Sequence, residues 1–264
     1  MKGIIYYYSG SGNTKLACEY IAEKIRPVKF ELADITKAPV ANLSDYDVSG
    51  FATFADFCGI PKLFDDFIKQ LPEQKSKVAF IFNTFGMMSG GTLRILNKKL
   101  VQKGFNIING FSLHTPENYP PLIAGGKGSE ESPNKTEIAE FYKFINSLDE
   151  QFNCIHAGRE LNSFKINYGG LFRFFPKPPK IIRIFMMGKK AVDSEKCNQC
   201  GICELKCPYN AVKCLPNPVF DEKKCEVCWA CYNHCPQKAI FTDKLKNKGH
   251  YSEPNKQVIQ RLKP

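Results

Sequence analysis

The 264-residue sequence lacks long hydrophobic runs, and it shows no recognisable targeting segment. No uninterrupted apolar stretch reaches the ~20 residues that a membrane-spanning helix needs. The apolar run at the beginning is short and no small-residue cleavage site follows it, so we expect no signal peptide and a cytoplasmic protein. The sequence does contain twelve cysteines, which in a cytoplasmic protein indicate metal binding rather than disulfides.

Signatures of nucleic-acid binding and of acid–base catalysis are also missing. The formal net charge of +11 would suit an anionic partner such as nucleic acid. However, no helix-turn-helix, zinc-finger or ribonucleoprotein motif accompanies this charge, and we therefore expect no nucleic-acid partner. No catalytic triad or pair of catalytic carboxylates is recognisable. Hydrophobic residues make up 43% of the chain, which is enough for a sizeable core and excludes wholesale disorder.

Residues 1–152 alternate strand-like and helix-like segments. Short runs rich in β-branched and aromatic residues predict strands at 3–8, 28–32, 47–54, 78–82 and 106–113. Helices are predicted at 13–26, 61–70, 89–103 and about 134–153. The strands are continuous apolar runs, as is typical of strands buried on both faces. We therefore predict an α/β fold, a doubly wound five-stranded parallel sheet that binds ligands at the carboxyl ends of its strands.

Two segments outside this pattern differ in composition. Residues 153–190 mix aromatic, proline and basic residues without a clear period, which we interpret as an interdomain linker. The alternative is a weak contact with a membrane surface through 171–190. Four basic residues in this stretch exclude a spanning helix, namely Arg173, Lys177, Lys180 and Arg183. The basic tail at 244–264 is predicted to be a poorly ordered or wrapping extension.

Residues 191–243 contain a repeat whose two copies align without gaps, 28 residues apart. Each copy spells C-x2-C-x2-C-x3-C-P. Three thiolates at intervals of three residues can surround one compact cluster, and the fourth, before a proline, is directed to the other cluster. We therefore predict two 4Fe-4S clusters. Their ligands are Cys197, Cys200, Cys203 and Cys235 for cluster 1, and Cys225, Cys228, Cys231 and Cys207 for cluster 2.

Zinc is the alternative metal for these cysteines, but zinc favours separated C-x2-C pairs, and the doubled eight-cysteine motif does not have that arrangement. The segment resembles a bacterial-type two-cluster ferredoxin, which implies a small α+β domain. Nearby residues are expected to shield the sulfurs or to form a core between the clusters; they are Trp229, Tyr209, Tyr232, Val212 and Ile240. The other cysteines are expected to be small buried hydrophobic residues: Cys18, Cys58, Cys154 and Cys214.

The stretch YSGSGNTK, residues 8–15, follows the first predicted strand and leads into a helix. A nucleoside-triphosphate loop would need a lysine followed by a hydroxyl residue, and a dinucleotide fingerprint would need a glycine where Lys15 stands. The third interpretation is a hydroxyl-rich loop that holds a phosphate at a helix N-terminus. Such a loop resembles the FMN loop of the flavodoxin family. The resemblance implies phosphate contacts from Ser9, Gly10, Ser11, Gly12, Asn13 and Thr14.

The flavodoxin resemblance also implies two loops that hold the flavin ring, after the third and fourth strands. The candidate residues are Thr53, Phe54, Ala55, Asn83, Thr84, Phe85 and Gly86, with Phe57 as a further ring neighbour. The tryptophan and tyrosine that usually sandwich the ring are absent from these loops, which contain phenylalanine and methionine instead. Met87 and Met88 fit either the ring site or the core, and His114 fits either a flavin contact or a structural position.

Together the two halves resemble flavodoxin–ferredoxin fusion proteins, an arrangement found in anaerobic bacteria and archaea. We predict a flavodoxin-like FMN-binding domain at 1–152, a linker at 153–190, a ferredoxin-like domain at 191–243 and an extension at 244–264. A cluster transfers one electron at a time, whereas a flavin takes one or two. The combination therefore predicts electron transfer between two 4Fe-4S clusters and a bound FMN.

Three functions are compatible with this prediction. The preferred one is a low-potential electron carrier between redox protein partners. The alternatives are an FMN-dependent oxidoreductase acting on a nicotinamide, quinone or oxidant, and a redox sensor. With both clusters and a flavin phosphate counted, the net charge falls to about +5. Lysines near the clusters would steer an acidic partner or simply be solvated; they are Lys189, Lys190, Lys196, Lys223 and Lys224.

Overall fold

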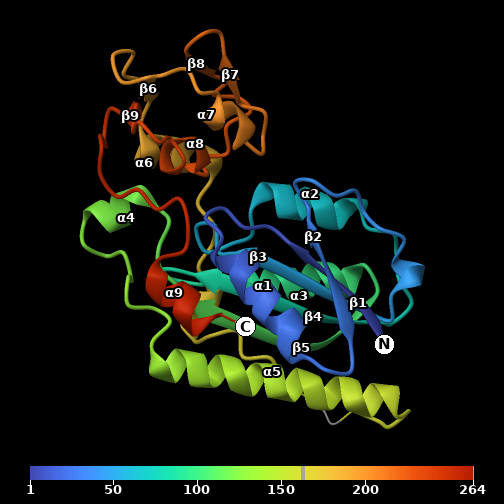
Figure 1. Cartoon of the computed structure of the whole chain (residues 1–264). Helices are drawn as coiled ribbons and strands as arrows, with labels where there is room; N and C mark the ends of the chain where they lie inside the picture. The colour runs from blue at the N-terminus through green and yellow to red at the C-terminus, as the bar shows by residue number, and fades with distance from the viewer. Residues whose placement is uncertain (162–163, 264) are drawn as a thin grey trace.

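The computed structural model describes residues 1–161 and 164–263. Strands and helices alternate through the first half of the chain, and short elements follow in the second half (Figure 1). The first half contains β1 (Lys2–Tyr7), α1 (Asn13–Lys24), β2 (Lys29–Asp34), η1 (Leu43–Asp45), β3 (Val48–Phe54), α2 (Lys62–Gln70), β4 (Lys77–Phe85), α3 (Thr92–Gln102), β5 (Phe105–His114), α4 (Pro120–Ala124) and α5 (Lys135–His156). Each predicted strand and helix of this half is therefore present, with shifted ends.

The five strands form one sheet in the order β2-β1-β3-β4-β5, and every neighbouring pair is parallel. This order is that of the flavodoxin-like doubly wound fold, so the predicted fold class is confirmed. The order reverses between β1 and β3. The loops that follow these strands meet at one edge of the sheet, where such folds bind their ligands.

Helices cover both faces of the sheet and enclose a hydrophobic core on each side (Figure 1). On one face, Ile21 of α1 and Leu148 of α5 are fully buried against the strands. On the other face, Phe64 of α2 and Leu96 of α3 are equally buried. Each such side chain contributes roughly 1.5–3 kcal/mol through burial, so the two cores hold the strand ends in fixed register.

The second half contains the cysteine repeats, together with η2 (Leu171–Phe174), α6 (Lys180–Met187), β6 (Lys190–Val192), α7 (Ile202–Leu205), β7 (Val212–Cys214), β8 (Pro218–Phe220), α8 (Ala230–Asn233), β9 (Ile240–Thr242) and α9 (Lys256–Arg261). Strand β6 pairs antiparallel with β9, and β7 with β8. Val212 and Ile240 lie in one core with Trp229 and Tyr232, so the predicted core between the repeats is confirmed. The result is the small α+β domain that the ferredoxin resemblance implies.

The C-terminal tail wraps back onto the first half of the chain. It runs from the cysteine-rich part down to α1 and α5, where α9 ends (Figure 1). Val258 and Leu262 are buried in the same core as α1 and α5. The Asn255 side chain accepts a hydrogen bond from the Val258 amide (2.9 Å) and caps α9. Of the two predicted forms of the tail, the wrapping form is therefore observed.

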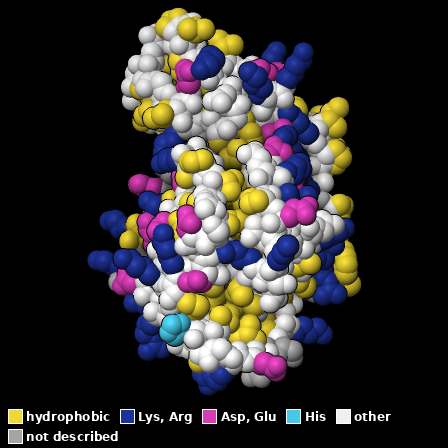
Figure 2. All heavy atoms as spheres, turned by 90° about the vertical axis from the view of Figure 1, so that its right-hand side faces the viewer, with side chains coloured by type: hydrophobic (Ala, Val, Ile, Leu, Met, Phe, Trp, Pro, Cys, Tyr) yellow, Lys and Arg dark blue, Asp and Glu magenta, His cyan; other side chains and the backbone are white. Residues whose placement is uncertain are grey.

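None of the helices in the described ranges is both long and apolar enough to cross a bilayer. Lys and Arg side chains are spread over the face shown in Figure 2, and hydrophobic side chains gather between the upper lobe and the body. Helix α6 exposes Ile181 and Phe185, at 76% and 74%, while its Arg183 and Met187 are buried. This helix therefore packs one side against the protein and leaves an apolar side uncovered.

Candidate functional site

The loop between β1 and α1 lies where the strand order reverses. The Ser9 hydroxyl accepts a hydrogen bond from the Gly12 amide (3.0 Å), and Gly12 has a φ of 98°, a conformation that favours glycine. Thr14 Oγ1 lies 2.8 Å from Thr84 Oγ1, which ties the loop to β4. The loop is thus held in one conformation with its amides at the N-terminus of α1, an arrangement suited to an anion.

A small cavity of ≈ 20 Å³ lies beside this loop, and we call it the phosphate-loop cavity. It is lined by Ser9, Gly10, Ser11, Asn13, Thr14, Phe54, Ala55, Thr84, Phe85, Gly86, Thr115, Pro116, Glu117 and Asn118. The tertiary structure therefore brings together three predicted loops that are far apart in the sequence. The lining of this cavity includes all but three of the residues predicted to hold FMN.

Gly12, Thr53 and Asn83 are not among the described residues that line this cavity. A Cβ atom on Gly12 would lie 2.7 Å from Pro254 Cδ, so this glycine makes room for the tail. Asn83 belongs to β4, which is longer than predicted, and its backbone pairs with Thr53 on one side and Ser112 on the other. The Ser112 hydroxyl also donates a hydrogen bond to Asn83 Oδ1 (2.6 Å). Asn83 and Thr53 therefore stabilise the sheet behind the cavity.

A larger cavity of ≈ 210 Å³ adjoins the first, and we call it the interdomain cavity. The first half of the chain contributes Phe54, Ala55, Asp56, Phe57, Cys58, Gly86, Met87, Met88, Glu117, Asn118, Tyr119 and Leu122, and the second half contributes Met186, Val227, Cys228 and Trp229. Phe54, Ala55, Gly86, Glu117 and Asn118 line both cavities. The two cavities therefore form one continuous site that ends at a predicted cluster ligand.

The walls of the interdomain cavity are mainly aromatic. The ring centroids of Phe57 and Tyr119 are 5.2 Å apart at 72°, and those of Tyr119 and Trp229 are 5.8 Å apart at 79°. Edge-to-face contacts of this kind hold each ring in place and leave ring faces for a further planar group. Phe54 and Phe57, predicted as ring neighbours, are part of this wall, whereas Phe85 lines only the phosphate-loop cavity.

Sequence reasoning missed the loop from Thr115 to Tyr119, which follows β5 and lines both cavities. The Glu117 carboxylate accepts hydrogen bonds from the amides of Met87 (3.0 Å) and Tyr119 (3.0 Å). It thereby joins this loop to the loop after β4. The available signal was its position after a fifth parallel strand, because the carboxyl ends of all the strands share one edge of the sheet.

Two predicted alternatives are decided by the geometry. Met87 is 51% exposed and lines the interdomain cavity, so its interpretation as a core residue is wrong. His114 Nδ1 lies 2.7 Å from Glu137 Oε1 and 2.9 Å from Ser132 Oγ. His114 lines neither cavity among the described residues, so it is a structural residue.

The predicted ligands of cluster 1 lie around one cavity. Cys197, Cys200, Cys203 and Cys235 all line it. Three of them come from the first repeat and one from the second, which is the crossed arrangement that the motif predicts. Cys214 also lines this cavity, with its Sγ 3.6 Å from Cys203 Sγ. Cys214, Cys58 and Cys154 are only half-buried, so of the cysteines that we expected to be buried hydrophobic residues, Cys18 alone is buried.

The predicted ligands of cluster 2 lie close together in the core of the second half. Cys231 is near enough to Cys225 and Cys207 to interact electrostatically, and Cys228 interacts with Cys231 and Cys225 in the same way. Cys225 and Cys231 are buried. The second repeat therefore holds its sulfurs further from water than the first repeat does, since Cys200 is exposed.

Lys190 points toward cluster 2 rather than toward solvent, so its grouping with the solvated lysines is wrong. Its Nζ lies 3.1 Å from Cys225 Sγ. Burial opposes the charge of Lys190, but the nearby sulfurs of Cys231 and Cys225 outweigh burial and raise the pKa. The ammonium group therefore remains charged beside a cluster ligand, where positive charge favours the reduced form of a cluster.

The backbone follows the same path in the two repeats. Left-handed φ angles recur at positions 28 residues apart: Gln199 (58°) and Val227 (62°), Gly201 (71°) and Trp229 (61°), Asn210 (50°) and Lys238 (50°). The Ala211 amide donates to Cys207 Sγ and the Ala239 amide to Cys235 Sγ, both at 3.2 Å. A non-glycine residue in this conformation costs roughly 1–2 kcal/mol. Both repeats bear this cost at two positions, and the second bears it also at Trp229, where the first has Gly201.

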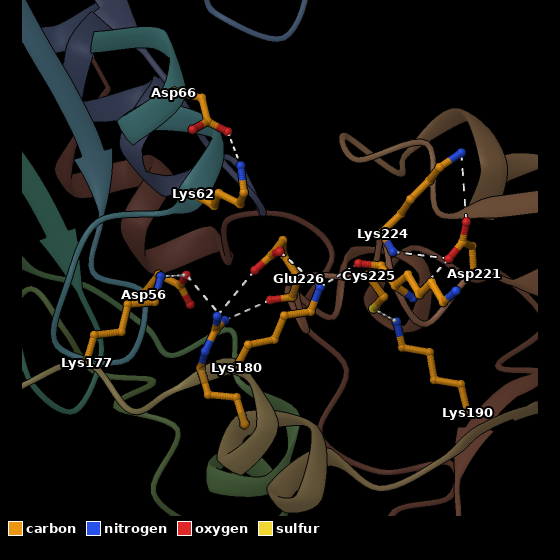
Figure 3. A network of polar contacts seen from close by, with 12 residues as sticks. Asp56, Lys62, Asp66, Lys177, Lys180, Lys190, Asp221, Lys224, Cys225 and Glu226 are labelled. Carbon is orange, nitrogen blue, oxygen red and sulfur yellow. Dashed lines mark hydrogen bonds and ion pairs between the residues drawn. The ribbon is translucent and has the colours of Figure 1, made fainter. Parts of the chain in front are cut away.

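Buried ion pairs join the two halves beside the interdomain cavity (Figure 3). Arg183 of α6 lies between Asp56, which follows β3, and Glu226 of the second repeat; the N–O distances are 3.9 Å and 3.3 Å. Lys177 pairs with Asp56, and Lys180 with Glu226 at 3.1 Å. Burial raises the pKa of Asp56, and the neighbouring Lys177 and Arg183 counteract it. The segment predicted as a linker thus supplies the cations that hold the halves together.

Polar contacts close the opposite side of the junction. Asn233 Nδ2 donates to the carbonyl oxygen of Asn118 (2.9 Å), a residue of the loop after β5 that lines both cavities. The Tyr251 hydroxyl donates to Asn13 Oδ1 (2.9 Å), which connects the tail to the first residue of α1. The cysteine-rich half therefore contacts the strand-end loops through its second repeat and through the tail.

Known proteins resemble the two halves separately. The 4Fe-4S binding domain family matches residues 190–213 and 218–241. An archaeal flavodoxin structure is 15% identical, covering 58% of this chain and 99% of that chain with a TM-score of 0.43. Flavodoxin 1 from Bacillus cereus is 20% identical, covering 58% and 97% with a TM-score of 0.42. Rubredoxin oxygen:oxidoreductase from Desulfovibrio gigas is 17% identical, covering 59% and 37% with a TM-score of 0.43. No curated protein matches this chain.

The sheet order and the cysteine repeats together define a redox protein. The repeats are 4Fe-4S binding motifs, one match for each copy. The sheet has flavodoxin-like topology, which the strand order alone establishes. The chain therefore joins a flavodoxin-like domain to a ferredoxin domain with two 4Fe-4S clusters, and its function is electron transfer.

Proposed function

We propose that the chain binds one FMN in the continuous site formed by the two cavities and transfers electrons between this flavin and its clusters. We assign residues 1–152 to the FMN-binding domain, 153–190 to the linker, 191–243 to the ferredoxin domain and 244–264 to the extension. One observation carries the proposal: the interdomain cavity is lined by the loops of the sheet and also by Cys228, a predicted ligand of cluster 2.

The phosphate-loop cavity has the chemistry that a flavin phosphate requires. Ser11 and Thr14 are polar residues with exposures of 5% and 1%, and their hydroxyls lie at the N-terminus of α1. Buried hydroxyls and amides can donate hydrogen bonds to phosphate oxygens without added positive charge. Ser9 orients the loop by accepting from Gly12, and Thr84 orients Thr14.

The interdomain cavity has the chemistry that a flavin ring requires. Its walls are aromatic and sulfur-containing side chains, which pack well against a planar ring. Glu117 holds the amides of Met87 and Tyr119, so two of the loops around the ring position cannot move independently. Trp229, a buried aromatic residue of the second half, also lines this cavity.

The relay would run from cluster 1 through cluster 2 to the flavin. FMN supplies two-electron storage and each cluster supplies one-electron transfer. Cys203 of cluster 1 lies near enough to Cys231 of cluster 2 to interact with it electrostatically, and Cys228 of cluster 2 lines the flavin cavity. The buried second repeat excludes water between these positions, and the exposed Cys200 leaves cluster 1 open to a partner.

The physiological role we favour is that of a low-potential carrier between redox proteins. Lys189, Lys196, Lys223 and Lys224 are exposed near the predicted cluster ligands, and they would steer an acidic partner toward the clusters. The uncovered apolar side of α6, within 171–190, adjoins the buried cations of the junction and offers a weak contact with a membrane surface.

An anaerobic visible spectrum of the full chain tests this function. We expect about eight irons and one FMN per chain after anaerobic purification. Dithionite should bleach the spectrum, and NADH or NADPH should leave it unchanged. Bleaching by a nicotinamide would instead indicate the FMN-dependent oxidoreductase. A chain with eight irons that takes up no flavin would contradict the FMN assignment and leave only a ferredoxin.

A further inference from the structure

The backbone at position 229 has a conformation that suits glycine. In the first repeat the equivalent residue is Gly201, with a φ of 71°. In the second repeat it is Trp229, with a φ of 61°. A large side chain is strained there, and residues held in such conformations are concentrated at functional sites. Val227, two residues earlier, is a second bulky residue with a left-handed φ, of 62°.

Both strained residues lie where the ferredoxin domain borders the flavodoxin-like domain. Val227 and Trp229 line the interdomain cavity on either side of Cys228. Their first-repeat counterparts, Gln199 and Gly201, line the cavity of cluster 1. The two copies of the motif therefore differ in bulk at the positions where the second copy meets the other domain. Both residues pack in the core of the second half and also border the interdomain cavity, so this bulk serves both the core and the cavity wall.

The indole of Trp229 is held in place by neighbouring rings. Trp229 is 2% exposed, and its ring contacts Tyr119 at 5.8 Å and Tyr232 at 5.2 Å. Such edge contacts between aromatic rings fix the orientation of each ring. Nε1 itself is fully buried, so a group in the cavity would contact the other atoms of the indole.

We propose that Trp229 is a flavin-binding residue supplied by the ferredoxin domain. Its indole closes the cluster side of the interdomain cavity and packs against the bound flavin ring. This inference rests on the proposed function. It assigns to the second cysteine repeat two tasks, since Cys228 ligates a cluster while the next residue binds the flavin.

Flavin affinity of the full chain with its clusters tests the proposal. Riboflavin and FMN are the two probes, because riboflavin lacks the phosphate and reports on the ring alone. We expect Trp229→Phe to weaken binding of both probes ~3–10-fold, because the smaller phenyl ring covers less of the flavin ring. We expect Trp229→Gly to weaken both by on the order of 30-fold, as for a buried tryptophan at the centre of a binding site.

Tyr232→Phe is the matched control. Tyr232 is buried beside Trp229 and its hydroxyl donates to the carbonyl oxygen of Lys248 (2.8 Å), but it does not line the cavity among the described residues. This variant perturbs the same core as the Trp229 variants, and it should bind riboflavin as the wild type does. Iron content near eight in each variant shows that the ferredoxin domain has folded.

Two negative results are distinguishable. Wild-type chain with eight irons that binds neither FMN nor riboflavin would overturn the proposed function together with this inference. Wild-type chain that binds FMN, alongside Trp229 variants with unchanged riboflavin affinity, would overturn the inference alone. Equal weakening by Trp229→Phe and Tyr232→Phe would also overturn it, because the effect would then arise from general loosening of the core.

Discussion

The two cysteine repeats have the same backbone and different surroundings. Cys200 of the first repeat is exposed, whereas its counterpart Cys228 lines the interdomain cavity. Asn198 is exposed, whereas its counterpart Glu226 is buried between two cations. The motif fixes the course of the chain around the clusters. The residues between the cysteines decide whether a copy faces water or the other domain.

This difference would give the proposed relay a direction in space. The first repeat exposes Cys200 to solvent, where a protein partner can approach, and the second repeat borders the interdomain cavity, our proposed flavin site. The cysteines of the two repeats also differ in burial. Burial matters because cluster potentials depend on solvent exposure and on nearby charge. Lys190 contributes such a charge to cluster 2. We therefore expect the two clusters to differ in potential although their ligands are alike.

Removing equivalent cysteines gives the largest expected contrast. Cys200→Ala and Cys228→Ala should each lower the iron content from about eight to about four per chain. We expect Cys228→Ala to lower the melting temperature further, by more than ~5 °C, because cluster 2 supports the buried core that contacts the other domain. Iron assay and thermal melting of both variants measure this. Equal melting temperatures would show that the repeats are structurally equivalent.

Glu226→Ala breaks the ion pairs that only the second repeat makes. It leaves the buried Arg183 with Asp56 as its remaining carboxylate, so we expect a loss of about 3 kcal/mol in the free energy of unfolding. Urea unfolding of the full chain measures this loss. The control is Asn198→Ala at the equivalent exposed position, which should change stability by less than about 0.5 kcal/mol. Similar losses in both variants would contradict a specific role for the junction.

Lys190→Met tests whether nearby charge separates the two clusters. Removing the ammonium group beside Cys225 should lower the potential of cluster 2 by on the order of 100 mV and leave cluster 1 unchanged. Potentiometric titration followed by electron paramagnetic resonance measures both clusters. Lys224→Met removes the same charge from an exposed ion pair with Asp221, and solvent screening should keep its effect small. A shift of the same size in both variants would argue against a specific effect of Lys190.

The smallest expected effect is a pH dependence of the stability. It arises where His250 of the tail contacts the second repeat. His250 stacks on Tyr232 at 4.3 Å, and its Nδ1 donates to the Tyr232 carbonyl oxygen. Burial, and secondarily Lys238, lower the pKa of His250 below 6.5. The unfolded chain then binds more protons than the folded chain, so stability falls as pH drops through 6.5 and levels off below the folded-state pKa.

Melting temperatures between pH 7.5 and 5.5 measure this effect, with His250→Gln expected to flatten the curve. The first repeat offers no equivalent, because the counterpart of Tyr232 is Glu204, which pairs with Lys213 at the surface. An unchanged pH slope in the variant would show that other groups cause the loss of stability.

Much of the fold was predictable because it depends on local patterns. Continuous apolar runs predicted the strands, and the alternation of strands with helices predicted the parallel sheet that is observed. The site was predictable only where a motif follows a strand, as at Ser9 to Thr14. The loop from Thr115 to Tyr119 carries no motif, so only its place at the sheet edge reveals it. The inward direction of Lys190 depends on packing, which no local pattern encodes.

The sequence by itself determined the metal chemistry, because cysteine spacing fixes which sulfurs can reach one cluster, and the family match agrees with that spacing. It also determined the sheet and the phosphate loop, because both depend on neighbouring residues. Only the tertiary structure decided that the second repeat, and not the first, borders the interdomain cavity. That choice depends on contacts between Arg183, Asp56 and Glu226, which lie far apart in the sequence and meet only when the chain is folded.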